Sequence, residues 1–120
     1  MILVDTSIWI LHLKSANHDL IDLLREARVV THPFVIGELA CGSLSRRGYF
    51  LELLCLLPQA KEASNQEVLG FIDEKKLYSQ GIGWIDAHLL ASARLSNITI
   101  FTTDKSLAKI ADKLDILYHP

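Results

Sequence analysis

Short aliphatic stretches alternate with helix-forming stretches along this chain, and this alternation constrains the fold more than any other feature. Ile2 to Val4 is too short for a helix and rich in β-forming residues, so we expect a buried first strand, with Asp5-Thr6-Ser7 capping a helix that begins near Ile8. Further strands are expected at 28–30, 98–101 and 115–118, and helices within 17–27, 31–47, 47–58, 64–78, 81–97 and 104–114. Such alternation indicates a parallel sheet covered by helices on both faces, an α/β fold.

Two helix starts carry recognisable capping residues. Thr31 is the cap candidate for the helix that has Pro33 in its first turn, and we expect that helix to continue through Gly37 and Gly42. The stretch 64–67, Ser-Asn-Gln-Glu, has the pattern of a capping box for the helix that follows.

Length and composition bound the possible classes of protein. The 120 residues suit one domain, residues 1–120, and are few for two. Half of the residues are hydrophobic and the formal net charge is -2, which excludes a disordered chain and a strongly basic protein that coats nucleic acid. No uncharged stretch reaches the roughly twenty residues that a membrane span needs, so we expect a soluble protein of the cytoplasm.

The two cysteines and two tryptophans are expected to be structural. Cys41 and Cys55 lie among apolar neighbours without metal-ligand spacing, so we expect buried thiols, as suits a reducing cytosol. We expect Trp9 and Trp84 to pack, with stacking on nucleobases as the alternative.

Two acids lie on helix faces that should be apolar. Residues three and four positions apart share a helix face, and around Glu38 those positions hold non-polar residues, at 34, 35, 41 and 42. Asp86 likewise has non-polar residues at 82, 83, 89 and 90. Neither acid has the surroundings of a solvated surface residue.

Two further acids, Asp5 and Asp104, each close an aliphatic strand and open a helix. The ends of parallel strands in an open α/β sheet converge on one crevice, so all four carboxylates are expected to meet there. Clustered acids repel one another unless a cation compensates. Oxygen ligands without a histidine or cysteine set favour Mg²⁺ or Mn²⁺, and such an ion can activate water for in-line attack on a phosphodiester.

Structural alternatives remain open for single members of this set. Asp5 and Asp104 could be simple N-caps. Glu38 could form a buried ion pair with an arginine, the candidates being Arg46, Arg47 and Arg94. Other acids lie in ordinary charged surroundings and are assigned to solvated faces.

Four stretches, taken together, resemble the PIN-domain ribonucleases, specifically the VapC-type toxins of bacterial toxin–antitoxin pairs. They are "LVDTSIWI", "HPFVIGELACGSL", "GIGWIDAHLLASA" and "FTTDKSL", which occur in the family's order along nearly the whole chain. The resemblance implies a Rossmann-like PIN fold that cleaves RNA with Mg²⁺ or Mn²⁺. The catalytic, metal-binding acids that it implies are Asp5, Glu38, Asp86 and Asp104.

The resemblance also implies supporting residues and partners. Ser7 and Thr103 resemble the hydroxyl residues that orient the ligands of the site by hydrogen bonds. The family implies a homodimer and a cognate antitoxin that places a basic side chain against the acids. The helical stretches 19–27 and 49–57 carry more apolar residues than one core-facing stripe uses, so we expect the antitoxin to lie across them.

Two rival classes of protein could also carry acids on this type of fold. A response-regulator receiver needs an acidic pair directly after its first strand, whereas Asp5 is followed by Thr6 and Ser7, which disfavours that class. A non-catalytic RNA-binding or protein-interaction module on the same fold is the remaining alternative. Such a module would hold RNA equally well in chelator and would cut none when metal is restored.

Overall fold

The centre of the fold is a three-stranded parallel sheet, seen in a computed structural model that describes residues 1–120. Its strands are β1 (Ile2–Val4), β2 (Val29–Val30) and β3 (Thr99–Phe101), in the order β2-β1-β3. β1 lies between the other two, with Leu3 opposite both Val30 and Ile100. β1 is buried along its whole length, as its aliphatic sequence predicts.

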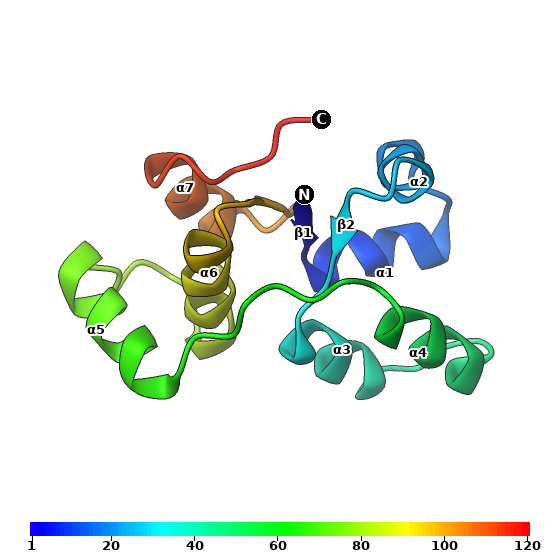
Figure 1. Cartoon of the computed structure of the whole chain (residues 1–120), viewed down its shortest axis with the longest axis horizontal. Coiled ribbons are helices and arrows are strands. Elements are labelled where there is room, and N and C mark those ends of the chain that lie inside the picture. The colour runs from blue at the N-terminus through cyan, green and yellow to red at the C-terminus, as the bar shows by residue number, and fades with distance from the viewer.

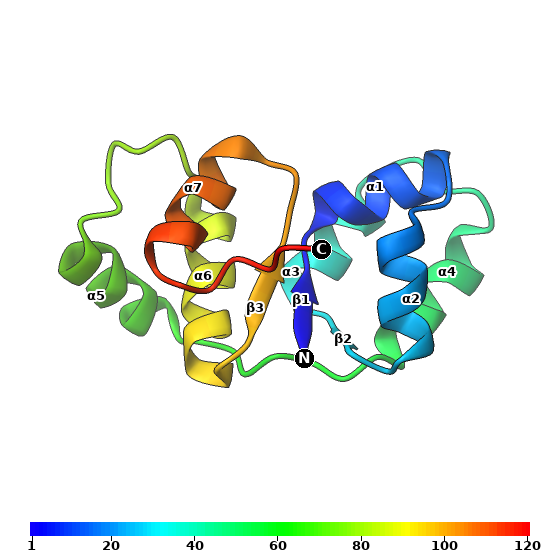
Figure 2. The ribbon, with the colours of Figure 1, turned by 90° about the horizontal axis from the view of Figure 1, so that it is seen from above.

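Seven helices surround the sheet and confirm the predicted α/β class. They are α1 (Thr6–Lys14), α2 (His18–Arg25), α3 (Pro33–Ala40), α4 (Arg47–Cys55), α5 (Asn65–Lys75), α6 (Trp84–Ser96) and α7 (Lys105–Lys113). The strands lie between α1 to α4 on one side and α5 to α7 on the other (Figures 1 and 2). None of these helices is both long enough and apolar enough to cross a membrane.

The helix starts show where the capping predictions hold. Ser64 and Glu67 form the predicted capping box, with Glu67 N–H donating to Ser64 Oγ at 3.0 Å and Ser64 N–H donating to Glu67 Oε1 at 2.9 Å. The cap of α3 is His32 and not Thr31, because Phe34 N–H donates to His32 Nδ1 at 3.0 Å. Thr31 instead forms a β-bridge with Gln59.

Two predicted elements are shorter than expected. α3 ends at Ala40 and does not continue through Gly42, and the backbone of Arg46 turns into the left-handed region (φ 51°) before α4 begins. The segment expected as a fourth strand at 115–118 makes a single bridge, between Leu117 and Ile100. Asp115, where that segment begins, is left-handed (φ 58°), which is incompatible with extended strand geometry.

One cluster of 23 buried residues forms the main core. Trp9 belongs to it, as predicted. The prediction of buried thiols is wrong, since Cys41 and Cys55 are both exposed. Both lie at the carboxyl end of a helix, α3 and α4 respectively, where the chain turns along the surface.

Candidate active site

Asp5 lies between the central strand β1 and α1. Figure 2 shows the chain passing directly from that strand into that helix. It occupies the N-cap position, but its side chain makes no capping hydrogen bond, so the simple N-cap alternative fails. The side chain is 6% exposed. Its Oδ2 accepts two hydrogen bonds, from Ser7 Oγ and from Thr102 Oγ1, each at 2.8 Å. These two hydroxyls fix the orientation of a buried carboxylate.

The second hydroxyl therefore belongs to Thr102 and not to the predicted Thr103. Thr102 Oγ1 also accepts the Asp104 N–H at 3.0 Å, so one hydroxyl ties together the carboxylate after β1 and the backbone of the residue that caps α7. Thr103 contributes only its backbone, with its N–H donating to Ser7 Oγ at 3.1 Å, and is exposed. Successive side chains leaving a strand point in opposite directions, which is why only one of two adjacent threonines reaches Asp5.

Glu38 lies on the exposed side of α3 and is connected to α1. Thr6 Oγ1 donates to Glu38 Oε1 at 2.7 Å. The alternative of an arginine ion pair fails, because no arginine forms a salt bridge with Glu38. Arg47 instead donates from Nη2 to the Ala40 carbonyl oxygen at 2.9 Å.

Asp86 lies half-buried in the first turn of α6. Gly83 N–H donates to its Oδ2 at 3.4 Å, a long hydrogen bond. Burial raises the pKa of Asp86, the Gly83 hydrogen bond opposes the shift, and the negative charges of the other three acids raise it further. The three are Asp5, Asp104 and Glu38, in decreasing order of effect. Segments far apart in the sequence thus place four carboxylates within electrostatic reach of one another.

Asp104 has the capping role that its position suggested. Its Oδ1 accepts the Leu107 N–H at 2.9 Å, at the start of α7. This bond uses one carboxylate oxygen and leaves Oδ2 without a protein hydrogen bond. Capping and ligand binding are therefore compatible in this residue.

The four acids share one pattern of bonding. Each has one oxygen hydrogen-bonded to the protein and a second oxygen with no protein partner: Asp5 Oδ1, Glu38 Oε2, Asp86 Oδ1 and Asp104 Oδ2. None belongs to an ion pair, because the three ion pairs of the chain involve other acids. The side chains do not form a group of three or more ligands close enough to hold a metal ion as they stand. As an all-oxygen donor set without a compensating cation, they fit a hard divalent ion by their chemistry.

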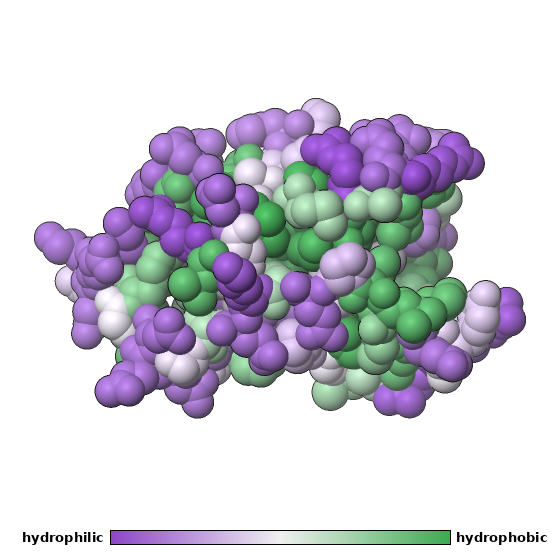
Figure 3. Space-filling view, in the orientation of Figure 1, coloured by the Kyte–Doolittle hydropathy of each residue, from purple (hydrophilic) through white to green (hydrophobic).

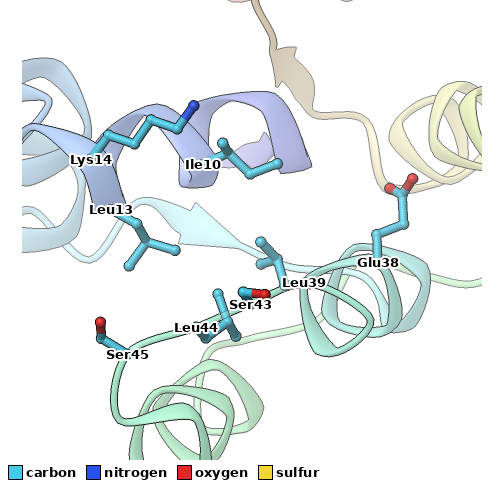
Figure 4. Close-up of a pocket in the computed structure, with 9 residues that line it drawn as sticks. Ile10, Leu13, Lys14, Glu38, Leu39, Ser43, Leu44 and Ser45 are labelled. Atoms are coloured by element: carbon cyan, nitrogen blue, oxygen red, sulfur yellow. The ribbon is translucent and has the colours of Figure 1, made fainter.

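An apolar groove begins beside Glu38. It has a volume of about 330 Å³ and runs between α1 and the chain from α3 to residue 45. Figure 4 shows Leu13 pointing from α1 toward Leu39 and Leu44, with Glu38 on the far side of Leu39 and Lys14 above. A charged residue of each sign thus borders a largely apolar depression.

Exposed apolar side chains continue this surface. The exposed side chains are Ile10, Leu11 and Leu13 on α1, Leu53 on α4, and Leu56, which directly follows α4. Figure 3 shows the corresponding hydrophobic area on the side of the molecule formed by α1 and α4. α2 adds no exposed large apolar side chain to this surface, because Leu20 and Leu23 are buried in the core and Leu24 packs against it. That the antitoxin also crosses α2 stays a prediction.

Comparison with known proteins identifies the family. The PIN domain family model matches residues 2–113. Ribonuclease VapC32, from two strains of Mycobacterium tuberculosis, is 43% identical to the chain over 108 residues, which are 89% of this chain and 87% of the relative. The chain therefore belongs to the PIN-domain family, among its VapC-type members.

A solved structure shows the same fold at low sequence identity. The crystal structure of PAE2754 from Pyrobaculum aerophilum matches with a TM-score of 0.59 and 15% identity, covering 95% of this chain and 88% of that chain. At this identity the similarity concerns the fold, and it agrees with the Rossmann-like architecture predicted from the sequence.

Proposed function

We propose that this chain is a metal-dependent ribonuclease, the toxin of a toxin–antitoxin pair, which hydrolyses RNA phosphodiester bonds. The observation that carries the proposal is the set of four carboxylates from distant segments, which lie within electrostatic reach of one another, each with one oxygen free and none in an ion pair. Such a set destabilises the fold by repulsion unless it has a cationic ligand. Membership of the PIN-domain family and the similarity to Ribonuclease VapC32 support this assignment.

Asp5, Glu38, Asp86 and Asp104 would hold Mg²⁺ or Mn²⁺ in this proposal. A bound ion of this type polarises a phosphoryl oxygen and lowers the pKa of water, which supplies a nucleophile at neutral pH.

The chain's own residues orient this site. Ser7 and Thr102 fix Asp5, and Thr6 fixes Glu38, so that the carboxylate after β1 and the carboxylate on α3 are held before substrate arrives. Burial raises the pKa of Asp86, and a neighbouring positive charge would oppose that shift by stabilising its ionised form.

The proposal is tested by RNA cleavage with purified wild type, Asp5→Asn and Asp86→Asn in Mg²⁺, in Mn²⁺ and in EDTA. Cleavage should require metal. The cleavage rate should fall by at least about a hundredfold in either variant, which is the loss expected when a group that stabilises the transition state is removed. Variants that cut at the wild-type rate would refute the mechanism. Metal-independent RNA binding without cleavage would instead support the non-catalytic module.

We propose that the cognate antitoxin occupies the apolar groove beside Glu38 and the exposed apolar residues of α1 and α4. An apolar segment suits the groove, and a basic side chain of the antitoxin would pair with Glu38 at its edge. Leu13→Asp should weaken the complex in a pull-down, whereas an exposed charged residue away from the groove, changed by Glu74→Gln, should leave it intact. We expect the toxin to act in the cytoplasm as a homodimer, which sedimentation of the purified chain tests.

A further inference from the structure

Trp84 is a large aromatic residue that the fold leaves uncovered beside the acids. It begins α6, two residues before Asp86, and is 41% exposed. The prediction that both tryptophans pack holds fully for Trp9, which is 3% exposed, and only in part for Trp84, whose ring also lies against His88. Trp84 does not stand alone on the surface, because Phe34 and Pro33 line the same apolar depression, and such a patch beside a candidate catalytic acid is a candidate ligand-binding surface.

Trp84 forms one wall of a second groove that reaches the acidic site. This groove has a volume of about 380 Å³, within the range of about 300–1,000 Å³ typical of small-molecule sites. Phe34 and Pro33 at the start of α3 line it together with Trp84 and Ile85 at the start of α6. Glu38 is its one charged lining residue, so a single carboxylate belongs both to the groove and to the acid set.

The aromatic walls are held in place by a buried histidine. The His88 ring lies 4.6 Å from the ring centroids of both Phe34 and Trp84, in tilted and edge-on arrangements respectively. His88 itself is fixed by a 3.1 Å hydrogen bond between its Nε2 and Asn65 Oδ1. A flat ligand would thus meet side chains that are already in place, so binding would cost little side-chain conformational entropy of the protein.

On the basis of the proposed ribonuclease function, we propose that this groove binds an unpaired nucleobase next to the scissile phosphodiester, with Trp84 stacking on the base. A nucleobase is flat and uncharged, which suits an aromatic groove bordered by a carboxylate, whereas a phosphate there would be repelled by Glu38. Because Glu38 lines the groove and Asp86 follows the lining residue Ile85 in the chain, a phosphodiester at the acids would place its neighbouring base within reach. Bases in a duplex are stacked and paired and cannot enter, so RNA recognition of this type selects single strands.

Tryptophan fluorescence tests the inference. The chain has two tryptophans, Trp9 and Trp84, so the substitution Trp9→Phe leaves Trp84 as the single source of tryptophan emission. Short single-stranded RNA is titrated into a Trp9→Phe, Asp5→Asn protein in Mg²⁺, where cleavage is not expected, and the same RNA is titrated as a duplex. Quenching of Trp84 should saturate with the single strand and be absent or much weaker with the duplex. Equal quenching by both forms, or no quenching, would overturn the inference.

Cleavage kinetics give a second readout in the wild-type background. Trp84→Ala should raise KM for single-stranded RNA roughly 5- to 150-fold, the factor that corresponds to stacking of one base, and Trp84→Phe should restore most of it. The matched control is Tyr49→Ala, since Tyr49 is 54% exposed on α4, away from the groove.

The outcomes separate this inference from the proposed function. Absence of metal-dependent cleavage in the wild type refutes the function itself. Normal cleavage with an unchanged KM in Trp84→Ala refutes only the base-binding groove. A Trp84→Ala protein that loses its dimeric state in sedimentation, with unchanged affinity for RNA, would assign the groove to a second copy of the chain and also overturn the inference.

Discussion

Replacing Thr102 by valine tests the hydrogen-bond network around Asp5 most sharply. Valine keeps the shape and β-branching of threonine but removes the hydroxyl, which donates to Asp5 Oδ2 at 2.8 Å and accepts the Asp104 N–H at 3.0 Å. A hydrogen bond to a charged group contributes about 1.5–3 kcal/mol and a neutral one about 0.5–1.5 kcal/mol. We expect Thr102→Val to lower the free energy of unfolding by about 2–4.5 kcal/mol, a large share of the roughly 5–15 kcal/mol typical of a domain.

The neighbouring residue supplies the control. Thr103 is exposed and its hydroxyl makes no hydrogen bond within the protein, so Thr103→Val should change stability by less than about 0.5 kcal/mol. Both variants are compared with wild type by urea denaturation in EDTA, followed by RNA cleavage in Mg²⁺. Equal losses of stability in the two variants, or a larger loss for Thr103→Val, would refute the assignment of Thr102 to the site.

Two further predictions concern pH. Because the pKa of Asp86 is raised above 3.8, the folded state holds this proton more tightly than the unfolded state, and the metal-free protein loses stability as pH rises from 3.8 through the raised value. In urea denaturation with EDTA, Asp86→Asn should therefore be more stable than wild type at about pH 7, and the two stabilities should converge at about pH 3. A stability difference that does not change with pH would contradict this. Burial lowers the pKa of His32, partly opposed by Glu62, so stability should fall as pH drops through 6.5. His32→Asn, which keeps a cap acceptor for Phe34 N–H, should show a smaller loss between about pH 7 and pH 5, and an identical pH dependence would refute the role of His32.

The four candidate acids stand out in the sequence because their chemistry conflicts with that of their neighbours. An acid after an aliphatic strand, as in Asp5, or on an apolar helix face, as in Asp86, stands out without any structure. The parallel sheet then predicts that strand ends converge, and the raised pKa of Asp86 is consistent with that convergence.

The remaining parts of the site depend on one-residue details of geometry. Whether Thr102 or Thr103 reaches Asp5 depends on which of the two side chains points toward Asp5 where the chain leaves β3. A shift of one residue along the chain would reverse the two orientations. The Thr6 bond to Glu38 joins residues 32 positions apart, so no local pattern indicates it. Trp84 looks like a core residue by type, and only the tertiary packing shows that one side of it is uncovered.

Calorimetric titration of Mn²⁺ into the purified chain tests the central claim most directly. The four free carboxylate oxygens predict saturable binding by the wild type and its loss in Asp86→Asn, with the structure of the variant otherwise intact by circular dichroism. A wild type that takes up no Mn²⁺ while still cutting RNA in EDTA would contradict the account.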